Sequence, residues 1–306
     1  MTIQQAKEWG AAEIFGAIGV DSSRLDAECL LQWATGLSKT QVLFSRGKEL
    51  TQAQEAAFCQ GVEKRKTGLP IAYITGKKEF FGRDFFVTPS VLIPKPDTEL
   101  LVEKALEELS KRTNAKHILT ICDMCTGSGC VGLTVLAEII AQKMFPREMI
   151  PSVTLVDISG DALAVAKKNA AELIESEYLE RVRFVQSNLF EAVPLKFDVI
   201  LSNPPYIPHR EAVALLTDGR AEPMLALDGD VDLFGNATAE DDGLGIMRNF
   251  VPQAFAHLSP HGVCIAESGE YNADDTAELF RAAGFRDVRI FTDLAGQKRD
   301  TIGRKL

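Results

Sequence analysis

The pattern of hydrophobic and polar residues divides the chain into two regions. Over residues 3–18 and 22–35 apolar side chains recur every three or four positions, which predicts two amphipathic helices. Thr51 is a suitable cap for a third helix, and the basic residues 64–66 would fall in its last turn. We therefore expect residues 1–75 to form a small N-terminal helical domain.

After residue 75 the pattern becomes that of a hairpin. Aromatic and β-branched residues surround a turn that is expected at residues 82–84. Asp97 or Thr98 is then expected to cap a helix that runs to about residue 111. We interpret residues 76–110 as a β-hairpin and a hinge.

Short apolar runs and helical periods alternate over residues 111–306, which is typical of a mostly parallel sheet with helices between its strands. The fold class is therefore predicted to be α/β, with a Rossmann-like sheet. The first strand is expected at residues 117–122, and a final pair at 288–291 and 301–303. The other expected strands are 153–156, 182–185, 199–201 and 263–266, and the helices are 131–141, 162–174, 247–257 and 276–283.

Composition and charge narrow the possible functions. The 306 residues are 46% hydrophobic and 25% charged, as in a globular protein with a full core. No apolar run approaches the ~18 residues of a membrane span, and the N-terminus lacks a signal-peptide pattern, so we expect a cytoplasmic protein without membrane contact. The net charge of −10 disfavours a partner held through phosphates, so direct nucleic-acid binding is not expected.

The six cysteines carry no metal or redox signature. Cys122 and Cys125 form a C-x-x-C pair, but the chain has no second pair at a zinc spacing. We therefore expect reduced thiols and no metal site.

A loop of small residues follows the first predicted strand and enters a helix, so its backbone can approach a ligand closely. Its glycine spacing fits a dinucleotide or an adenosyl cofactor, and Asp157, at the end of the second strand, suits the ribose of either. Asp123 favours the adenosyl cofactor, because a carboxylate holds the ammonium of S-adenosylmethionine and repels a pyrophosphate. The alternatives are that Asp123 braces the loop and that Asp157 caps the next helix. The loop consists of Cys125, Thr126, Gly127, Ser128 and Gly129.

The segment Asn203-Pro204-Pro205-Tyr206 follows an apolar run that predicts a buried strand. The two prolines end the strand and stiffen the loop, at the edge where open α/β sheets bind ligands. The Asn203 side-chain oxygen and the Pro204 carbonyl can accept both hydrogens of an –NH2 group, and Tyr206 offers a flat face to a planar amide or base. These features predict a substrate site, against the alternative of a simple diproline turn.

Together these residues resemble the HemK/PrmC family, the S-adenosylmethionine-dependent methyltransferases that modify a glutamine on class-I peptide chain release factors. The resemblance also covers residues 72–76, 93–99, 156–163, 222–227 and 293–296. It implies a class I methyltransferase sheet over residues 111–306, an N-terminal domain that contacts the release factor, and S-adenosylhomocysteine as product. It implies Asn203, Pro204 and Tyr206 as catalytic residues, and Pro205 beside them at the substrate. The cofactor residues that it implies are Asp123, Cys125, Thr126, Gly127, Ser128, Gly129, Asp157, Asn188, Leu189 and Asn203.

Three departures from the family pattern carry expectations of their own. Cys125 replaces a glycine, so it must avoid positive φ or accept strain. Asn188 replaces an acidic residue and is a weaker acceptor for the adenine amino group. Residues 229–242 form an insertion that we expect to be acidic and solvated. Asp228, Asp230 and Asp232 suggest a calcium loop, but Leu233 and Ala239 stand where that loop needs Gly and Glu.

Other functions fit parts of the sequence. A glutamine methyltransferase acting on a ribosomal protein would use the same motifs. An adenine-N6 methyltransferase acting on nucleic acid shares the Asn-Pro-Pro-Tyr segment, but the net charge and the lack of a basic domain disfavour it. A methyltransferase-fold scaffold without turnover is supported only by Cys125 and Asn188, and a nicotinamide oxidoreductase only by the glycine spacing.

Overall fold

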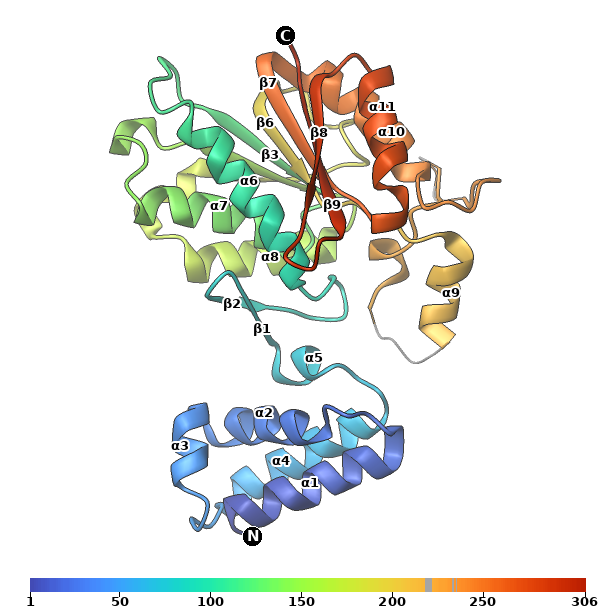
Figure 1. Cartoon of the computed structure of the whole chain (residues 1–306). Coiled ribbons are helices and arrows are strands. Elements are labelled where there is room, and N and C mark those ends of the chain that lie inside the picture. The colour runs from blue at the N-terminus through green and yellow to red at the C-terminus, as the bar shows by residue number, and fades with distance from the viewer. Residues whose placement is uncertain (218–221, 233, 235) are drawn as a thin grey trace. The chain divides into compact units, whose positions relative to one another are not determined.

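The computed structural model describes residues 1–217, 222–232, 234 and 236–306. The chain forms two compact units. The first comprises Met1–Lys77 and a short stretch after Ala214, and the second comprises Lys78–Ala214 and Glu222–Leu306. Each unit has its own buried core, so each is described by itself (Figure 1).

The first unit is helical. Its helices are α1 (Ile3–Ile18), α2 (Ser23–Thr35), α3 (Lys39–Phe44), α4 (Gln52–Lys66) and α5 (Ile71–Thr75). The predicted cap of α4 is confirmed, because the Thr51 hydroxyl accepts the Gln54 N–H and the Gln54 side chain accepts the Thr51 N–H. The sequence did not predict α3 and α5, which are too short to show a helical period. The core of this unit is built from Ile3, Ala6, Ile14, Leu30, Leu31, Val42, Leu50, Phe58, Val62 and Ile74.

The second unit contains a seven-stranded sheet in the order β5-β4-β3-β6-β7-β9-β8. β9 runs antiparallel to both of its neighbours, β7 and β8, and the other neighbouring strands are parallel, so the predicted mostly parallel sheet with a closing pair is confirmed. The strands are β3 (Thr120–Met124), β4 (Ser152–Asp157), β5 (Val182–Gln186), β6 (Phe197–Ser202), β7 (Leu258–Glu267), β8 (Arg286–Thr292) and β9 (Lys298–Arg304). The helices are α6 (Glu99–Ser110), α7 (Cys130–Ala141), α8 (Gly160–Leu173), α9 (His209–Thr217), α10 (Gly245–His257) and α11 (Ala273–Ala282).

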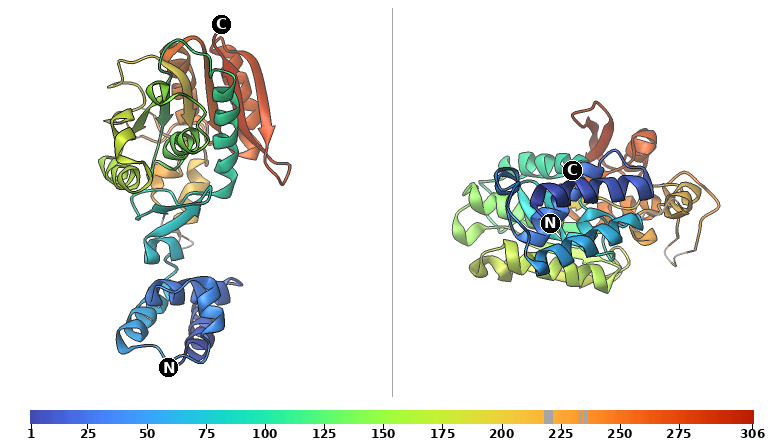
Figure 2. Two further views of the ribbon diagram at one scale, coloured as in Figure 1. Left: turned by 90° about the vertical axis from the view of Figure 1, so that its left-hand side faces the viewer. Right: turned by 90° about the horizontal axis from the view of Figure 1, so that it is seen from below.

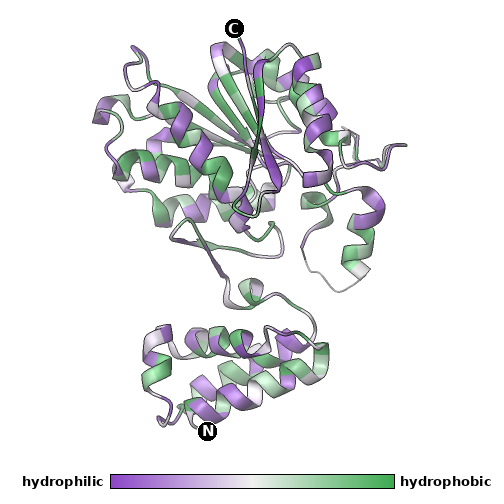
Figure 3. Cartoon of the chain, in the orientation of Figure 1, coloured by the Kyte–Doolittle hydropathy of each residue, from purple (hydrophilic) through white to green (hydrophobic). Residues whose placement is uncertain are grey.

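Alternate residues of the central strands feed two separate apolar clusters. Ile121, Val199 and Leu201 pack with α6, α7 and α8 in one cluster, whereas Cys122 and Ile200 pack with α10 and α11 in the other. Because side chains alternate between the faces of a sheet, the two groups of helices cover opposite faces. Figures 1 and 2 show these two layers, and Figure 3 shows the apolar strands between them.

Several predicted boundaries are wrong. The strand expected at 263–266 begins five residues earlier, at Leu258. The first strand is β3, which begins three residues later than expected and extends through Asp123 to Met124. The hairpin strands are β1 (Lys77–Phe80) and β2 (Arg83–Phe86), so the turn lies at Phe81 and Gly82 rather than at 82–84. Both turn residues have positive φ, as a tight two-residue hairpin turn requires.

The predicted side-chain cap of α6 is also wrong. A 3₁₀ turn over Pro96–Thr98 leads directly into this helix, and Thr98 makes no side-chain capping bond. Asp97 instead pairs with Arg299 at 3.0 Å, and the Thr98 hydroxyl accepts a hydrogen bond from Asn203. The two polar side chains are therefore used for tertiary contacts.

None of the helices in the described parts of the chain combines the length and the apolar content of a membrane span.

Asn169 of α8 joins the hairpin to the loop after β3. Its amide donates to the carbonyls of Phe86 and Ser128 and accepts from the Phe86 N–H, at 2.7–3.0 Å. Asn169→Ala leaves these buried backbone groups without partners, so we expect a loss of about 2–4 kcal/mol of unfolding free energy. Urea unfolding measures the loss. The exposed Asn114→Ala is the matched control and should stay within about 0.5 kcal/mol of the wild type; equal stability of both variants would contradict the role of Asn169.

Candidate active site

The loop between β3 and α7 is held in a strained conformation. Gly127 and Gly129 have φ of 54° and 82°, which glycine adopts without cost. Cys125 has φ of 58°, a value that strains any residue with a Cβ. Of the two outcomes expected for this position, the structure therefore shows the strained one. The Thr126 N–H donates to the Val156 carbonyl at 3.0 Å and fixes the loop to β4.

Asp123 is buried at the end of β3 and braces this loop. Its Oδ2 accepts from the Thr126 hydroxyl at 2.6 Å and from the Gly132 N–H at 2.9 Å. Burial raises the pKa of Asp123 to about 6, and these two hydrogen bonds oppose the rise. Within the described residues no hydrogen bond uses Oδ1, so bracing the loop leaves this oxygen for a ligand.

Asp157 connects the loops that follow two neighbouring strands. Its Oδ2 accepts from the Gly127 N–H at 2.8 Å and its Oδ1 from the Ser159 N–H at 2.9 Å. Burial raises the pKa of this carboxyl group above its usual value. The Ser159 hydroxyl caps α8, because it accepts a hydrogen bond from the Ala162 N–H. The alternative prediction, that Asp157 caps this helix, is therefore wrong.

The diproline loop begins where β6 ends, beside the end of β3. The Ser202 hydroxyl donates to the Met124 carbonyl at 2.8 Å and joins the two strand ends. The Asn203 Nδ2 donates to the Thr98 hydroxyl at 3.0 Å. The Tyr206 hydroxyl donates to Glu267 Oε1 at 3.2 Å, and burial raises the pKa of Tyr206 far above its usual value. Side chains at both ends of the Asn-Pro-Pro-Tyr segment are therefore fixed.

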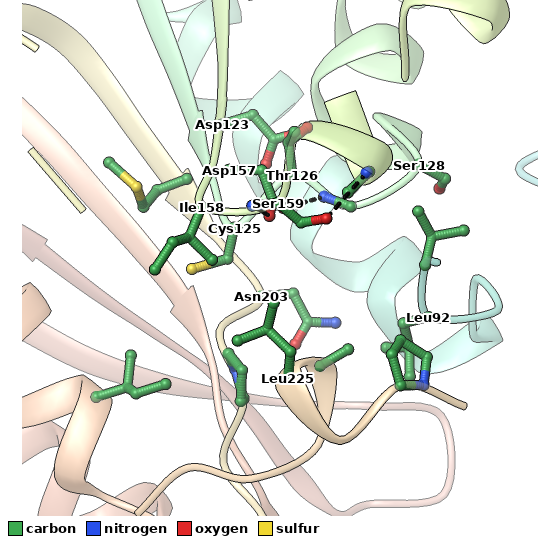
Figure 4. Close-up of a pocket in the computed structure, with 18 of the residues that line it drawn as sticks. Leu92, Asp123, Cys125, Thr126, Ser128, Asp157, Ile158, Ser159, Asn203 and Leu225 are labelled. Carbon is green, nitrogen blue, oxygen red and sulfur yellow. Dashed lines mark hydrogen bonds between the residues drawn. The ribbon is translucent and has the colours of Figure 1, made fainter. Parts of the chain in front are cut away.

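A cavity of about 260 Å³ lies between the two loops (Figure 4). Gly129, Pro204 and Tyr206 do not line it, although they belong to the same two loops. The structure brings together at its wall the predicted residues Asp123, Cys125, Thr126, Gly127, Ser128, Asp157, Asn188, Leu189, Asn203 and Pro205.

The sequence analysis missed the apolar side chains that complete the cavity wall. Ile158 follows Asp157 and is exposed at the end of β4, Leu92 comes from the segment after the hairpin, and Leu225 from the segment after α9 (Figure 4). In the sequence, an apolar residue directly after a strand-end carboxylate could have indicated this apolar wall, but that pattern identifies only Ile158. Leu92 and Leu225 lie far apart in sequence and meet only in the fold.

The wall fits S-adenosylmethionine in its chemistry. The buried Asp123 carboxylate and the half-buried Asp157 carboxylate suit an ammonium group and a pair of ribose hydroxyls, and the apolar side chains suit a purine ring. A Cβ placed on Gly127 would meet no atom within 4 Å, so the loop backbone is open to a ligand at that point.

The expectation of a solvated acidic insertion is wrong for its first residues. Asp228 and Asp230 are buried. Asp230 Oδ2 accepts from the Gly243 N–H at 2.8 Å, and Asp228 binds the His209 ring at 2.6 Å, so these carboxylates hold loop backbone and a neighbouring helix end. Leu233, which was expected to break the calcium-loop pattern, lies outside the described residues.

Comparison with solved structures agrees with the fold. A Thermus thermophilus 16S rRNA methyltransferase, in complex with AdoMet and guanosine, matches with a TM-score of 0.51 at 18% identity, over 75% of this chain and 50% of that one. At this identity the likeness concerns the fold alone. A profile described as "Methyltransferase small domain" matches residues 97–250, and one described as "PrmC N-terminal domain" matches residues 6–76. The fold and the matched profile thus define a methyltransferase with the class I fold.

Curated relatives give the family. A protein of Moorella thermoacetica is 37% identical over 301 residues, which cover 98% of this chain and 97% of that protein. A protein of Salmonella typhimurium is 35% identical over 285 residues, with 93% of each chain covered. Both are named release factor glutamine methyltransferase. This chain belongs to the family of release factor glutamine methyltransferases, so the predicted resemblance is confirmed.

Gly132 of α7 allows the helix to approach Asp123. A Cβ at this position would lie 2.6 Å from Leu155 Cδ2 and 3.0 Å from Asp123 Oδ2. Gly132→Ala should therefore displace the carboxylate, weaken S-adenosylmethionine binding at least tenfold and lower stability by about 1–3 kcal/mol. Calorimetry and urea unfolding measure the two effects.

Gly16→Ala is the matched control, because this helical glycine is exposed and its Cβ would meet no atom within 4 Å. It should leave binding unchanged and raise stability by about 0.5–1 kcal/mol. A Gly132→Ala protein with wild-type affinity and stability would show that the close approach to Asp123 does not matter.

Proposed function

We propose that this chain transfers a methyl group from S-adenosylmethionine to the side-chain amide nitrogen of a glutamine in class-I peptide chain release factors. The names of its near-full-length relatives support the substrate. The position of Asn203 is the observation that carries the chemistry, because its amide lies on the cavity wall and is held there by Thr98. We place the reaction in the cytoplasm, where release factors act.

The proposal assigns a task to each part of the chain. Residues 1–75 would recognise the release factor, residues 76–110 would form the hairpin and hinge, and residues 111–306 would carry the reaction. No nucleic-acid contact is part of the proposal.

Four residues would hold S-adenosylmethionine, which supplies an electrophilic methyl group when bound. Asp123 Oδ1 would accept from its ammonium, and Asp157 would accept from its ribose hydroxyls. Asn188 would accept from the adenine amino group, with Leu189 as an apolar neighbour of the ring. All four residues line the cavity. The raised pKa of Asp123 should fall when a cation binds, because the positive charge favours the carboxylate.

The substrate nitrogen is a poor nucleophile, because amide resonance holds its lone pair; the C–N rotation barrier of ~18–20 kcal/mol reflects this resonance. The Asn203 oxygen and the Pro204 carbonyl would accept both N–H bonds, and they would stabilise positive charge that develops on the nitrogen. The aromatic face of Tyr206 would support the amide plane. Positioning of this kind supplies about 7–11 kcal/mol in favourable cases.

No general base has to act before the transition state, because the nitrogen becomes acidic only after the methyl group has arrived. The substrate therefore needs oriented acceptors rather than a histidine or cysteine. This agrees with Cys125, whose burial raises its thiol pKa far above the usual value and keeps the thiol protonated.

Asn203→Ala should abolish methyl transfer while S-adenosylmethionine binding stays within about threefold of the wild type. The variant removes the main acceptor of the substrate N–H bonds. The Asn203 side chain is expected to contribute less to cofactor binding than the carboxylates of Asp123 and Asp157. Transfer of a labelled methyl group and calorimetric binding measure the two effects. Turnover near the wild-type rate would exclude this role for Asn203.

The substrate is tested directly by offering labelled S-adenosylmethionine with purified release factors, a ribosomal protein and DNA, followed by mass spectrometry of the modified residue. We expect label on a single glutamine of a class-I release factor. Preferential label on the ribosomal protein or on adenine in DNA would replace the proposed substrate with one of the other two.

A further inference from the structure

A cluster of buried polar side chains lies behind the diproline loop. Glu267 is 1% exposed, Asp300 is 0% exposed and Thr98 is 2% exposed. In the antiparallel pairing of β7 with β9, Glu267 stands opposite Asp300. Glu267 is the last residue of β7 and Asp300 lies inside β9, and neither belongs to a motif that marks it as functional in the sequence.

The cluster contacts the proposed substrate site at two points. The Tyr206 hydroxyl donates to Glu267 Oε1 at 3.2 Å. The Thr98 hydroxyl also interacts with the Glu267 carboxylate and favours its ionised form, and it accepts from the Asn203 Nδ2 at 3.0 Å. The Thr98 hydroxyl therefore lies between Glu267 and the Asn203 amide, whereas the Tyr206 hydroxyl binds Glu267 directly.

This chain of hydrogen bonds has a direction. An ionised carboxylate only accepts, so the hydrogen of the Thr98 hydroxyl is used on Glu267. The Thr98 oxygen can then only accept from Asn203. An asparagine side chain can otherwise bind either way round, but here its nitrogen must face Thr98, which leaves its oxygen for the cavity. The charge of Glu267 thus decides which end of the amide a substrate meets.

The neighbouring acid favours a charged Glu267. Both Asp300 oxygens and Glu267 Oε2 lack a hydrogen-bond partner among the described residues. Two adjacent buried acids do not both ionise, and Asp300, which has no donor, is the poorer place for the charge. A proton on one Asp300 oxygen that points to Glu267 Oε2 would give both of these atoms a partner, while two hydroxyl donors stabilise the Glu267 carboxylate.

The other charged groups around the pair act in both directions. Arg299 of β9 favours the ionised form of Glu267, Asp97 of the 3₁₀ turn opposes it, and Lys104 of α6 favours the ionised form of Asp300. Burial is the largest influence and raises the pKa of Glu267 to about 7. Glu267 therefore changes charge near neutral pH.

We propose that Glu267 is a positioning residue for methyl transfer, which acts through the Thr98 hydroxyl to turn the Asn203 oxygen toward the substrate. This role rests on the proposed function, because it concerns how Asn203 meets an –NH2 group. It adds two residues, Thr98 and Glu267, that touch neither reacting atom.

Thr98→Val and Glu267→Gln test the proposal. Valine cannot accept from Asn203, and a glutamine amide can donate to Thr98 and so release the Thr98 hydrogen toward the Asn203 oxygen. We expect kcat to fall roughly 100-fold in both variants, while the Kd for S-adenosylmethionine stays within about threefold. Thr98→Ser retains the hydroxyl and should restore kcat to within about fivefold of the wild type.

Thr134→Val is the matched control. This threonine is also fully buried, but its hydroxyl has no partner among the described residues, and it does not line the cavity. The variant should retain wild-type kcat. If the role of Thr98 were purely structural, the Thr98→Val and Thr98→Ser variants would have similar kcat values at equal cofactor affinity.

The pH profile of the wild type supplies a test without substitution. At saturating S-adenosylmethionine, which removes the contribution of Asp123 to cofactor binding, kcat should rise with pH through about 7 as Glu267 ionises. The Glu267→Gln variant should lack this step. A flat wild-type profile, or Thr98→Val and Glu267→Gln proteins with kcat within about twofold of the wild type, would overturn the inference. A wild-type protein that methylates no release factor would instead overturn the proposed function.

Discussion

The site depends on the adjacency of two parallel strands, β3 and β6. Met124 pairs with Ser202 at their carboxyl ends, and the Ser202 hydroxyl donates to the Met124 carbonyl at 2.8 Å. Because the strands are parallel, the loops that leave them must start at the same edge of the sheet. One loop carries the glycines and the other carries the two prolines, so the residues proposed to bind cofactor and substrate become neighbours through the topology alone.

The two loops are held by buried polar groups rather than by apolar packing. Asp123 accepts hydrogen bonds from its loop and from α7, Asp157 accepts two from the loops, and Glu267 accepts from the far end of the diproline segment. Burying these acids opposes their ionisation, which raises the pKa of each. A preorganised site of this kind meets its ligand without first rearranging, and that is the usual source of electrostatic catalysis.

Much of this arrangement could be predicted from the sequence, and the failures concern features that leave no local sequence pattern. The apolar runs located the strands of the alternating region along the chain, and the glycine and diproline segments located both loops. Asp123 was placed just after the first strand, and Glu267 and Asp300 were not singled out, because a carboxylate inside a strand resembles a solvated one in sequence. Phe81 was placed outside the turn because bulky residues rarely adopt positive φ. Partners distant in sequence, such as Thr98 and Asn203, left no local pattern.

The central claim is that the Asn203 oxygen receives the N–H bonds of an amide beside the cavity. A crystal structure of the protein with S-adenosylhomocysteine and a glutamine-containing segment of a release factor tests it most directly. The claim predicts the glutamine side-chain nitrogen about 3 Å from both the Asn203 Oδ1 and the Pro204 carbonyl oxygen. A glutamine bound elsewhere, or an Asn203 side chain that presents its nitrogen to the substrate, would contradict it.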